Sequence, residues 1–320
     1  MSILVTGAAG FIGTNLVRNL LSNGEIVIGV DNLCRGSINN IEELIANPNF
    51  SFYKIDISNL LEFKNLMVEI NARTPITEVW HMAANSDIPA GIEDSFIDLR
   101  DTFMTTFNTL SIMKEFGIKV ISFASSSAIY GDLGSIPLTE SIGPILPISN
   151  YGAMKLASEA LISAATESYL TKSYIFRFPN VIGVPATHGV MLDFIKRLAQ
   201  NSSSLQVLGN GTQQKGYLHV DELIDAMLFI KNESSEKVSV FNIGCGDQGI
   251  TVKDIAKETV RQASPGAEIV YGDGDKGWVG DVPKFIYSID KLKKLGWSPK
   301  LNSAQAVAKA ISQIIKQESK

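Results

Sequence analysis

The chain has 320 residues, of which 45% are hydrophobic and 19% charged, with a formal net charge of −5 at pH 7. This length allows one large α/β domain, or one such domain with a smaller lobe. The acidic balance, without a dense cluster of Lys or Arg, argues against a nucleic-acid-binding protein. The two cysteines, Cys34 and Cys245, have no metal-ligand spacing, so we expect no metal site and a reducing compartment.

The first ten residues, MSILVTGAAG, are apolar but follow no basic segment, and Gly7 interrupts the apolar run. This pattern predicts a buried strand rather than a signal peptide. No uninterrupted apolar run approaches the ~18 residues that a membrane-spanning helix needs. We therefore expect a cytoplasmic protein.

Short β-branched runs alternate with helical patterns through the first half of the chain. Strands are predicted at 3–7, 25–31, 50–57, 78–84, 119–126 and 172–179. Helices are predicted at 11–23, 59–71, 93–116 and 151–170. Because the strands are continuously apolar and separated by helices, they predict a doubly wound parallel sheet covered on both faces.

The pattern changes after about residue 179, where prolines, glycines and short elements become frequent. A helix at 219–231 and a strand at 238–244 are expected to return to the first sheet. The remaining segments predict a smaller α/β lobe that ends in an amphipathic helix near 302–316.

The segment TGAAGFIG places Gly7, Gly10 and Gly13 between the first strand and the first helix. Glycines there permit a tight turn, a close approach of a pyrophosphate and close packing of helix on strand. Such a motif alone is weak evidence for dinucleotide binding. However, Asp31 ends the second strand, where a carboxylate can accept hydrogen bonds from the adenosine ribose hydroxyls. Asp31 would repel a 2′-phosphate and so favours NAD over NADP, whereas the nearby Arg35 keeps NADP open.

Asp56 ends the third predicted strand, and two interpretations of it remain open. Its carboxylate could reach the adenine of the same cofactor. It could equally cap the helix predicted at 59–71.

The segment YGAMK places Tyr151 and Lys155 on one face of a helix, four residues apart. A tyrosine with its ordinary pKa of about 10 is a poor base at neutral pH. A neighbouring ammonium and a positively charged nicotinamide would stabilise the phenolate. A second YxxxK, Tyr287 with Lys291, has no comparable hydroxyl cluster before it, and we interpret it as coincidence.

Several segments occur in a defined order: the glycine turn, Asp31, HMAAN after the fourth strand, SSSAIYG after the fifth, YxxxK, and RFPNVIG after the sixth. In this order they resemble an extended short-chain dehydrogenase/reductase of the NAD-dependent nucleotide-sugar epimerase/dehydratase family, of the UDP-glucose 4-epimerase-like type. GNGTQQKGYLHVDEL and GWVGDVPKFIYSIDKLKKLGW are similar to later family segments, so the resemblance covers essentially the whole chain. Each segment alone is common in proteins, but the segments in this order are specific to the family.

The resemblance implies a Rossmann-type doubly wound parallel sheet with a smaller C-terminal substrate-binding α/β lobe. Residues 1–178 and about 217–243 would form the NAD-binding Rossmann domain. Residues 179–216 and 244–320 would form the nucleotide-sugar-binding lobe. The long helices at about 93–116 and 151–170 would pair across a homodimer interface.

The resemblance also implies roles for the residues of the two central motifs. Tyr151 would be the catalytic base, and Lys155 would lower the pKa of Tyr151 and bind the cofactor ribose. Ser126 would position the sugar 4-OH, because the family's hydroxyl residue lies four positions before the tyrosine found here as Tyr130. Ser125 would lie against the cofactor.

Further positions follow from the same resemblance. The cofactor-binding residues would be Gly7, Gly10, Phe11, Ile12, Gly13, Asp31, Asn32, Arg35, Asp56, Ile57, Ala83, Ala84, Ser125, Tyr151, Lys155 and Pro179. The substrate-binding residues would be Ser126, Ser127, Asn180, His188, Gly189, Val190, Lys215, Tyr217 and Trp278. For Asn180, an amide that only stabilises its loop is the alternative.

The chain departs from the family pattern at three positions. Lys215 supplies a point charge where a bidentate cation would grip the pyrophosphate. Trp278 stands where an arginine is frequent, and Thr102 where an asparagine is frequent. These departures leave open which nucleotide the substrate carries and how its phosphates are bound. They do not affect the chemistry of the cofactor.

The two residues that follow Ser126 distinguish between the reactions of the family. A 4,6-dehydratase needs an Asp–Glu pair there to remove the C5 proton and protonate the leaving 6-OH, but this chain has Ser127 and Ala128. We therefore predict an NAD-dependent 4-epimerase of a UDP-hexose or UDP-N-acetylhexosamine. The alternatives are a 4,6-dehydratase or 4-ketoreductase that uses Asp87 or Glu93, and a dinucleotide-binding regulator without turnover.

Overall fold

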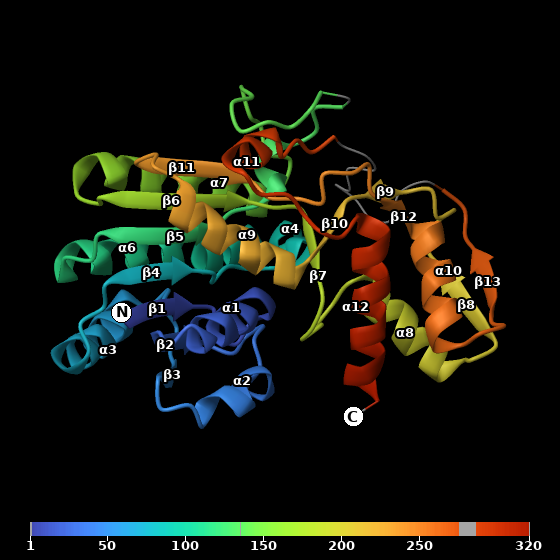
Figure 1. Ribbon diagram of the computed structural model, residues 1–320, viewed down its shortest axis with the longest axis horizontal. Helices are drawn as coiled ribbons and strands as arrows, with labels where there is room; N and C mark the ends of the chain where they lie inside the picture. The colour runs from blue at the N-terminus through green and yellow to red at the C-terminus, as the bar shows by residue number, and fades with distance from the viewer. Residues whose placement is uncertain (1, 135, 275–285, 320) are drawn as a thin grey trace. The chain divides into compact units, whose positions relative to one another are not determined.

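The computed structural model describes residues 2–134, 136–274 and 286–319 (Figure 1). The chain forms two compact units. The first unit contains Met1–Gly131, Gly143–Arg177 and Met227–Phe241, and the second contains Asp132–Ile142, Phe178–Ala226 and Asn242–Lys320.

The first unit is built on a seven-stranded sheet in the order β11-β6-β5-β4-β1-β2-β3 (Figure 1). Its strands are β1 (Ser2–Thr6), β2 (Ile26–Asp31), β3 (Phe50–Lys54), β4 (Glu78–His81), β5 (Val120–Ala124), β6 (Lys172–Arg177) and β11 (Val238–Asn242). The pairs β1–β2, β2–β3, β1–β4, β4–β5 and β5–β6 are parallel. The predicted fold class, including the return of the last strand to this sheet, is confirmed.

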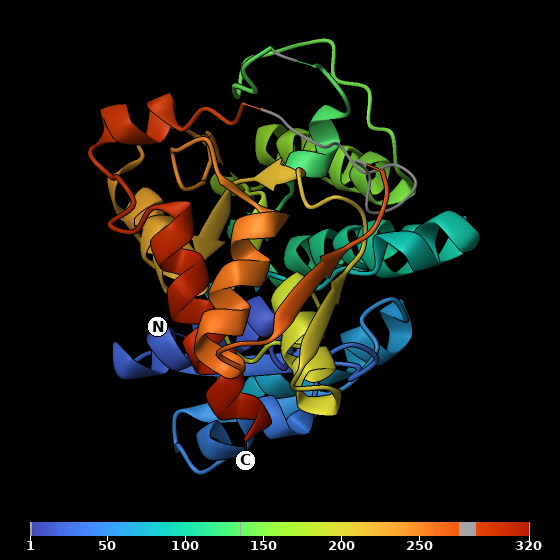
Figure 2. The same ribbon diagram turned by 90° about the vertical axis from the view of Figure 1, so that its right-hand side faces the viewer.

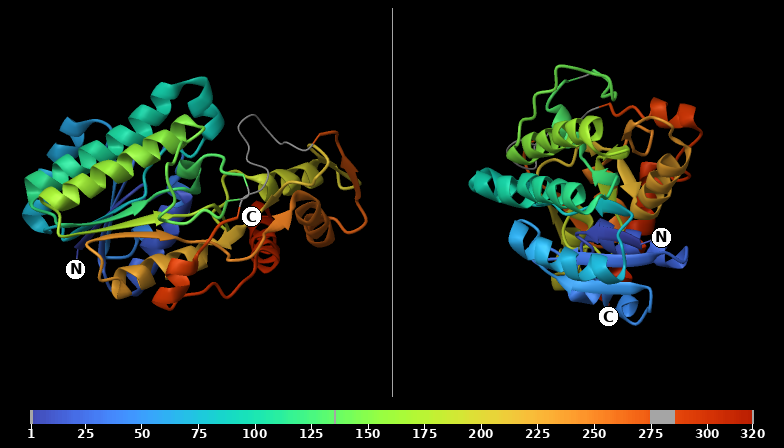
Figure 3. Two further views of the ribbon diagram at one scale, coloured as in Figure 1. Left: turned by 90° about the horizontal axis from the view of Figure 1, so that it is seen from above. Right: turned by 90° about the vertical axis from the view of Figure 1, so that its left-hand side faces the viewer.

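Helices cover both faces of this sheet. They are α1 (Phe11–Ser22), α2 (Ile38–Ile45), α3 (Leu60–Arg73), α4 (Ile88–Glu93), α5 (Ser95–Asp98), α6 (Thr105–Phe116) and α7 (Asn150–Ser168), and α9 (Val220–Glu233) divides between the units. Helices α6 and α7 run side by side along one face of the sheet (Figure 3).

The helix predicted at 93–116 begins two residues later, at Ser95, and continues to Phe116 with a π-helical turn inside it. Asp94 lies in extended backbone after α4, and its carboxylate accepts the N–H of Phe96 at 3.0 Å and starts α5. A π-helical turn, η1 (Leu99–Met104), then precedes α6. The hydroxyls of Thr105 and Thr106 both donate to the carbonyl oxygen of Thr102 at 3.0 Å, and such side-chain bonds compete with regular helix geometry.

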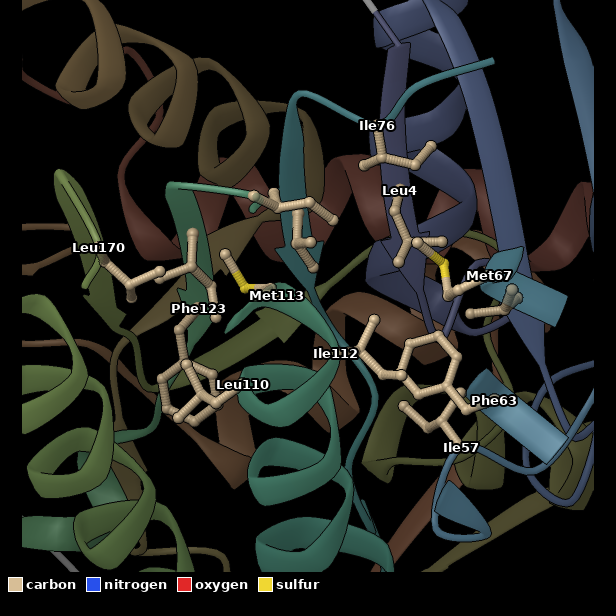
Figure 4. Close-up of a cluster of buried hydrophobic side chains, with 14 of the residues drawn as sticks. Leu4, Ile57, Phe63, Met67, Ile76, Leu110, Ile112, Met113, Phe123 and Leu170 are labelled. Atoms are coloured by element: carbon tan, nitrogen blue, oxygen red, sulfur yellow. The ribbon is translucent and has the colours of Figure 1, made fainter. Parts of the chain in front are cut away.

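The main hydrophobic core lies between the sheet and helices α3, α6 and α7 (Figure 4). Phe63 and Met67 of α3 and Met113 of α6 are completely buried there, next to Leu4 of β1 and Phe123 of β5. This packing fixes the carboxyl ends of the central strands, which is where the predicted site residues begin.

The second unit has its own elements and its own core. Its elements are β7 (Asn180–Ile182), α8 (Val190–Gln200), β8 (Ser204–Val207), β9 (Gln214–Lys215), β10 (Tyr217–His219), β12 (Ile250–Thr251), α10 (Val252–Ala263), β13 (Glu268–Tyr271), α11 (Asp290–Leu295) and α12 (Ser303–Glu318). β8 and β13 pair in parallel beside α10 (Figure 2). Ile195 of α8, Ile255 of α10 and Ile311 of α12 are buried in this core.

Across residues 2–134, 136–274 and 286–319, the structure contains no helix long and apolar enough to cross a membrane.

Candidate active site

The sheet order creates a switch point between β1 and β4. The chain continues from β1 to β2 on one side, while β4 pairs with β1 on the other. In open α/β sheets, ligands bind outside the carboxyl ends of the strands at such a point. Gly7 follows β1 here, and the N–H of Ala83, after β4, donates to Thr6 Oγ1 at 3.2 Å. Ala84 follows and is half-buried.

The glycine turn leaves the start of α1 open to an anion. Gly7 has a φ of +67°, and a Cβ added at Gly13 would overlap the carbonyl oxygen of Gly7. Gly10 is the N-cap of α1 and provides no side-chain cap. The N–H groups of Phe11 and Ile12, in the first turn, have no intrahelical acceptor and can bind a phosphate. This cradle fits the pyrophosphate of NAD.

Asp31, at the end of β2, is held by two backbone donors. Its carboxylate accepts the N–H of Ala9 at 3.0 Å and that of Leu33 at 2.8 Å. Burial raises the pKa of this carboxyl, and the backbone donors oppose the rise. Arg35 was the residue that left NADP as an alternative cofactor. In the structure it forms an ion pair of 3.0 Å with Asp87. The arrangement fits a ribose diol better than a 2′-phosphate.

Asp56 does not cap the following helix, so that interpretation of its role was wrong. Its carboxylate accepts the N–H of Ser58 at 2.9 Å in a local turn. The N-cap of α3 is Asn59, whose side chain accepts the N–H of Glu62 at 3.3 Å. Contact of Asp56 with adenine remains a prediction.

Two further predicted cofactor residues lie close to the same strand ends. The Asn32 side chain accepts the N–H of Cys34 at 3.0 Å and tightens the turn after β2. The Ile57 side chain is buried in the core, and its carbonyl oxygen accepts the Asn108 amide at 2.9 Å. The Ile57 side chain therefore has little free surface for contact with a cofactor.

Ser126 and Tyr151 are brought together by close contact of two short segments. Ser126 caps the 3₁₀ turn η2 (Ser127–Tyr130) by accepting the N–H of Ala128 at 3.1 Å. A Cβ at Gly152 would overlap the carbonyl oxygen of Ala128, so glycine permits the start of α7 to rest on this turn. The Ser126 hydroxyl lies beside the Tyr151 side chain and lowers the pKa of its phenol.

Lys155 lies one helical turn after Tyr151 and is almost completely buried, with 2% of its surface exposed. Its Nζ donates to the carbonyl oxygen of Ala124 at 2.6 Å. The same atom lies 4.7 Å from the ring centre of Phe123 and 5.8 Å from that of Tyr151. Burial lowers the pKa of Lys155 to about 7, while the carboxylate of Glu159 acts in the opposite direction.

The Tyr151 phenol is a weak acid without bound ligands. Burial raises the pKa of Tyr151 to about 12, the hydrogen bond with Ser126 lowers it, and the charge of Asp98 raises it further. The phenolate that a base requires therefore depends on added positive charge. Lys155 and a nicotinamide cation are suited to supply it.

A buried ion pair that was not predicted from the sequence supports this region. Arg177 of β6 bonds Glu159 of α7 at 2.7 Å and the Tyr130 hydroxyl at 3.0 Å. The Ser125 hydroxyl, predicted to lie against the cofactor, donates to Glu159. The only local signal was the position of Glu159 one helical turn after Lys155.

The two acids proposed for a dehydratase, Asp87 and Glu93, have other surroundings in the structure. Asp87 accepts the N–H of Ala90 at 3.1 Å as the cap of α4 and pairs with Arg35. Glu93 ends α4 and is exposed. Ser127, in η2, carries no acid group.

In the second unit, Asn180 of β7 and Tyr217 of β10 are paired in register. The Asn180 amide donates to the carbonyl oxygen of Gly216 at 3.3 Å, a bond that stabilises its loop. Tyr217 is buried, and its N–H donates to the Ser303 hydroxyl at 3.1 Å. Lys215 is half-buried in β9, two positions before Tyr217.

Three of the predicted substrate residues, His188, Gly189 and Val190, lie at the start of α8. His188 is exposed and contacts the Thr187 hydroxyl at 3.0 Å. Gly189 is the N-cap of α8, with a φ of +109° and no side-chain cap, and Val190 is the first helical residue. Pro179, between β6 and β7, is half-buried. Trp278 lies outside the residues that the structure describes.

Two positions singled out in the sequence have structural contacts. Thr102, which replaces a frequent asparagine, accepts the N–H of Asn85 at 3.1 Å. The hydroxyl of Tyr287, from the second YxxxK, donates to Asn242 Oδ1 at 3.1 Å in the second unit.

The switch-point sheet, the glycine cradle and Asp31 define a dinucleotide-dependent α/β enzyme. The chain belongs to the NAD-dependent epimerase/dehydratase family, whose family model matches residues 3–244. The predictions of this family, of an enzyme and of NAD as its cofactor are confirmed.

Known members of the family are similar to the chain over nearly its whole length. The UDP-glucose 4-epimerase of Lacticaseibacillus casei is 31% identical over 323 residues, covering 93% of this chain and 92% of its own. The UDP-glucuronate 4-epimerase of Thermodesulfobacterium geofontis is 30% identical over 317 residues, covering 97% and 94%. The structure of Thermotoga maritima UDP-glucose 4-epimerase with UDP-glucose has a TM-score of 0.85 and 30% identity, covering 99% and 100%.

Proposed function

We propose that the protein is an NAD-dependent 4-epimerase of a UDP-hexose or UDP-N-acetylhexosamine. One observation carries the proposal: the close contact of Gly152 with Ala128 brings Tyr151 next to the turn of Ser126, and Ser127 follows where a dehydratase would need an acid. The relatives that act on UDP-sugars at C4 support the same reaction.

The chain's own residues would hold and move the proton on the sugar O4. Ser126 positions the 4-OH, and Tyr151 takes its proton as the phenolate. Lys155, anchored on Ala124, stabilises that phenolate and binds the cofactor ribose. NAD supplies the chemistry of accepting a hydride from C4 and returning it.

Epimerisation requires that the resulting 4-keto sugar present its other face to the same hydride. No second acid is needed, because the Tyr151 hydroxyl returns its proton to O4 at the end. A 4,6-dehydratase would need further groups at C5 and C6, and Ser127 and Ala128 are not suited to supply them.

We assign NAD binding to the first unit and nucleotide-sugar binding to the second. The glycine cradle and Asp31 support the first assignment. The uncapped start of α8 at Gly189 and the charge of Lys215 support the second, because both suit a diphosphate. Asn180, His188 and Trp278 complete the proposed sugar-nucleotide contacts.

A homodimer in a reducing, cytoplasmic compartment completes the proposal. Exposed apolar side chains lie along α5, η1 and α6, among them Phe96, Leu99 and Phe107 at 58%, 39% and 43% exposure. A second copy of the chain would cover them. Cys34 and Cys245 are both free thiols. A monomer by light scattering at micromolar concentration would contradict the dimer.

The test is a screen of UDP-, GDP- and dTDP-sugars with NAD⁺, with products analysed by mass spectrometry and NMR. We expect a C4 epimer from a UDP-sugar. Tyr151→Phe should abolish most turnover and leave NAD binding intact, whereas a non-catalytic regulator would be unaffected. A 4-keto-6-deoxy product would contradict the proposal.

A further inference from the structure

The buried ion pair of Arg177 and Glu159 also bonds two hydroxyls of the turn that carries Ser126. Arg177 Nε and Nη2 donate to the Glu159 carboxylate at 3.0 and 2.7 Å, which is a bidentate contact. Arg177 Nη1 donates to the Tyr130 hydroxyl at 3.0 Å. Glu159 accepts the Ser125 hydroxyl. One ion pair therefore contacts both ends of segment 125–130.

These two hydroxyls flank Ser126, the residue assigned above to the sugar 4-OH. Ser125 directly precedes Ser126, and Tyr130 follows it by four residues. The exposed fractions of Ser125 and Tyr130 are 1% and 0%. Because neither hydroxyl reaches solvent, its protein partner determines where it lies.

The turn η2 between these hydroxyls has weak internal hydrogen bonding. The N–H of Ala128 donates to Ser126 Oγ at 3.1 Å, and that of Ile129 donates to the Ser126 carbonyl oxygen at 3.4 Å. A 3₁₀ turn has poorer hydrogen-bond geometry than an α-helix. We therefore expect contacts with neighbouring elements to fix the conformation of η2.

Stability alone does not account for an ion pair at this position. Burying two charges costs desolvation energy, and apolar side chains of similar volume often stabilise a protein at least as well. An apolar pair could fill the space of Arg177 and Glu159. It could neither donate to the Tyr130 hydroxyl nor accept from Ser125.

The ion pair also connects the turn to the catalytic helix. Helix α7 carries Glu159 as well as Tyr151. Near the start of the same helix, Gly152 lies so close to Ala128 of η2 that an added Cβ would overlap the Ala128 carbonyl oxygen. The position of Ser126 relative to α7 is thus set at both ends of the turn and in its middle.

We propose that Tyr130 is a positioning residue: its hydroxyl, bonded by Arg177, holds the turn η2 so that Ser126 stays beside Tyr151. The proposal rests on the roles assigned to Ser126 and Tyr151 under the proposed function. The Tyr130 side chain is completely buried, so it acts on the reaction through Ser126 and not by contact with the substrate.

The first test is a kinetic cycle with Tyr130→Phe, which keeps the ring and removes the hydroxyl. We expect kcat to fall about 10–100-fold, because a small displacement of a group that orients the substrate is enough for such a loss. In a Ser126→Ala background the same change should alter kcat by less than about 2-fold, since the residue through which Tyr130 acts is gone.

Tyr169→Phe is the matched control for this cycle. The Tyr169 hydroxyl donates to the carbonyl oxygen of Leu110 at 2.9 Å, at the other end of α7, and its loss should leave kcat unchanged. An undiminished kcat in Tyr130→Phe would overturn the proposal. A full loss on top of Ser126→Ala would overturn it too.

A second readout needs neither substrate nor turnover. Hydrogen exchange measured by NMR reports the Ala128 N–H, which donates to Ser126 Oγ. In Tyr130→Phe and in Ser125→Ala this N–H should exchange about 10-fold faster, and in Tyr169→Phe at the wild-type rate. An unchanged rate in Tyr130→Phe, or in Ser125→Ala if Tyr130→Phe does not fold, would refute the positioning role. A wild-type protein without epimerase activity would instead refute the proposed function, and the exchange rates would still decide whether Tyr130 holds the turn.

Discussion

The Nζ of Lys155 donates a hydrogen bond of 2.6 Å to the carbonyl oxygen of Ala124, the last residue of β5. Ser126 follows Ala124 by two residues and lowers the pKa of Tyr151. One strand end therefore anchors the cation and presents the hydroxyl, so the distances among the three groups depend on the sheet rather than on a loop.

Lys155→Met should lower kcat by about 10²–10⁴-fold, because the phenolate of Tyr151 loses its stabilising charge. Steady-state kinetics with the NAD-loaded protein measure this loss. NAD binding should persist in part, because the glycine cradle and Asp31 are unchanged. Near-wild-type turnover in this variant would contradict the role of Lys155.

The same variant should change the pH dependence of stability. The pKa of Lys155 is about 7 in the folded protein against an ordinary 10.5. Between these values the unfolded chain holds a proton that the folded chain has lost, so the free energy of unfolding rises with pH. Urea unfolding across this range should show a rise of about 1–4 kcal/mol that is missing in Lys155→Met. If the free energy of unfolding changed with pH in the same way in both proteins, the lowered pKa of Lys155 would be contradicted.

Gly152→Ala should separate Tyr151 from Ser126, because the new Cβ would overlap the carbonyl oxygen of Ala128. We expect a loss of activity of about 10²-fold and a loss of stability of about 1–3 kcal/mol. Kinetics and thermal unfolding measure the two effects. Gly143→Ala, where an added Cβ meets no atom within 4 Å, is the matched control. Equal activity of both variants would show that the close contact is not required.

Asp31→Ala should weaken NAD⁺ binding by about 10–100-fold, because a charged acceptor for the ribose hydroxyls is lost. It should also cost about 1–3 kcal/mol of stability, since the N–H groups of Ala9 and Leu33 lose their acceptor. Asp31→Asn keeps an oxygen for one of them and should narrow the preference for NAD over NADP. Calorimetric titration with both dinucleotides measures these changes. An unaltered preference would place cofactor selection elsewhere.

Glu159→Gln should destabilise the protein by about 3–5 kcal/mol, because Arg177 would remain buried with an uncompensated charge. The double replacement Glu159→Gln with Arg177→Met should cost less than the sum of the single changes, since it removes both charges. Denaturant unfolding of the three variants gives the coupling. If the losses of unfolding free energy were additive, the interaction between Glu159 and Arg177 would contribute nothing to stability.

The strands, the glycine turn and the YxxxK helix could be predicted because their signals are local. Continuous apolar runs give buried strands, and Gly7, Gly10 and Gly13 have a fixed spacing that the backbone of the turn requires. Ser126 and Tyr151 were paired through their motifs, and the turn that begins at Ser126 lies against the start of the helix that carries Tyr151.

The buried charges could not be predicted, because burial of an acid depends on partners distant in sequence. Asp98 is held by Asn85, and Glu159 by Arg177, and neither pairing leaves a periodic pattern. The exact start of the helix predicted at 93–116 depends on the side chain of Asp94, whose hydrogen bond to the N–H of Phe96 begins the helix at Ser95.

The most direct test of 4-epimerisation is the fate of a deuterium placed at C4 of the UDP-sugar. Hydride removal and return to the same carbon predicts a C4 epimer that keeps its deuterium at C4, with no solvent hydrogen incorporated at C5. A 4-keto-6-deoxy sugar with deuterium at C6 and solvent hydrogen at C5 would contradict the proposal. NMR and mass spectrometry of the product distinguish the two results.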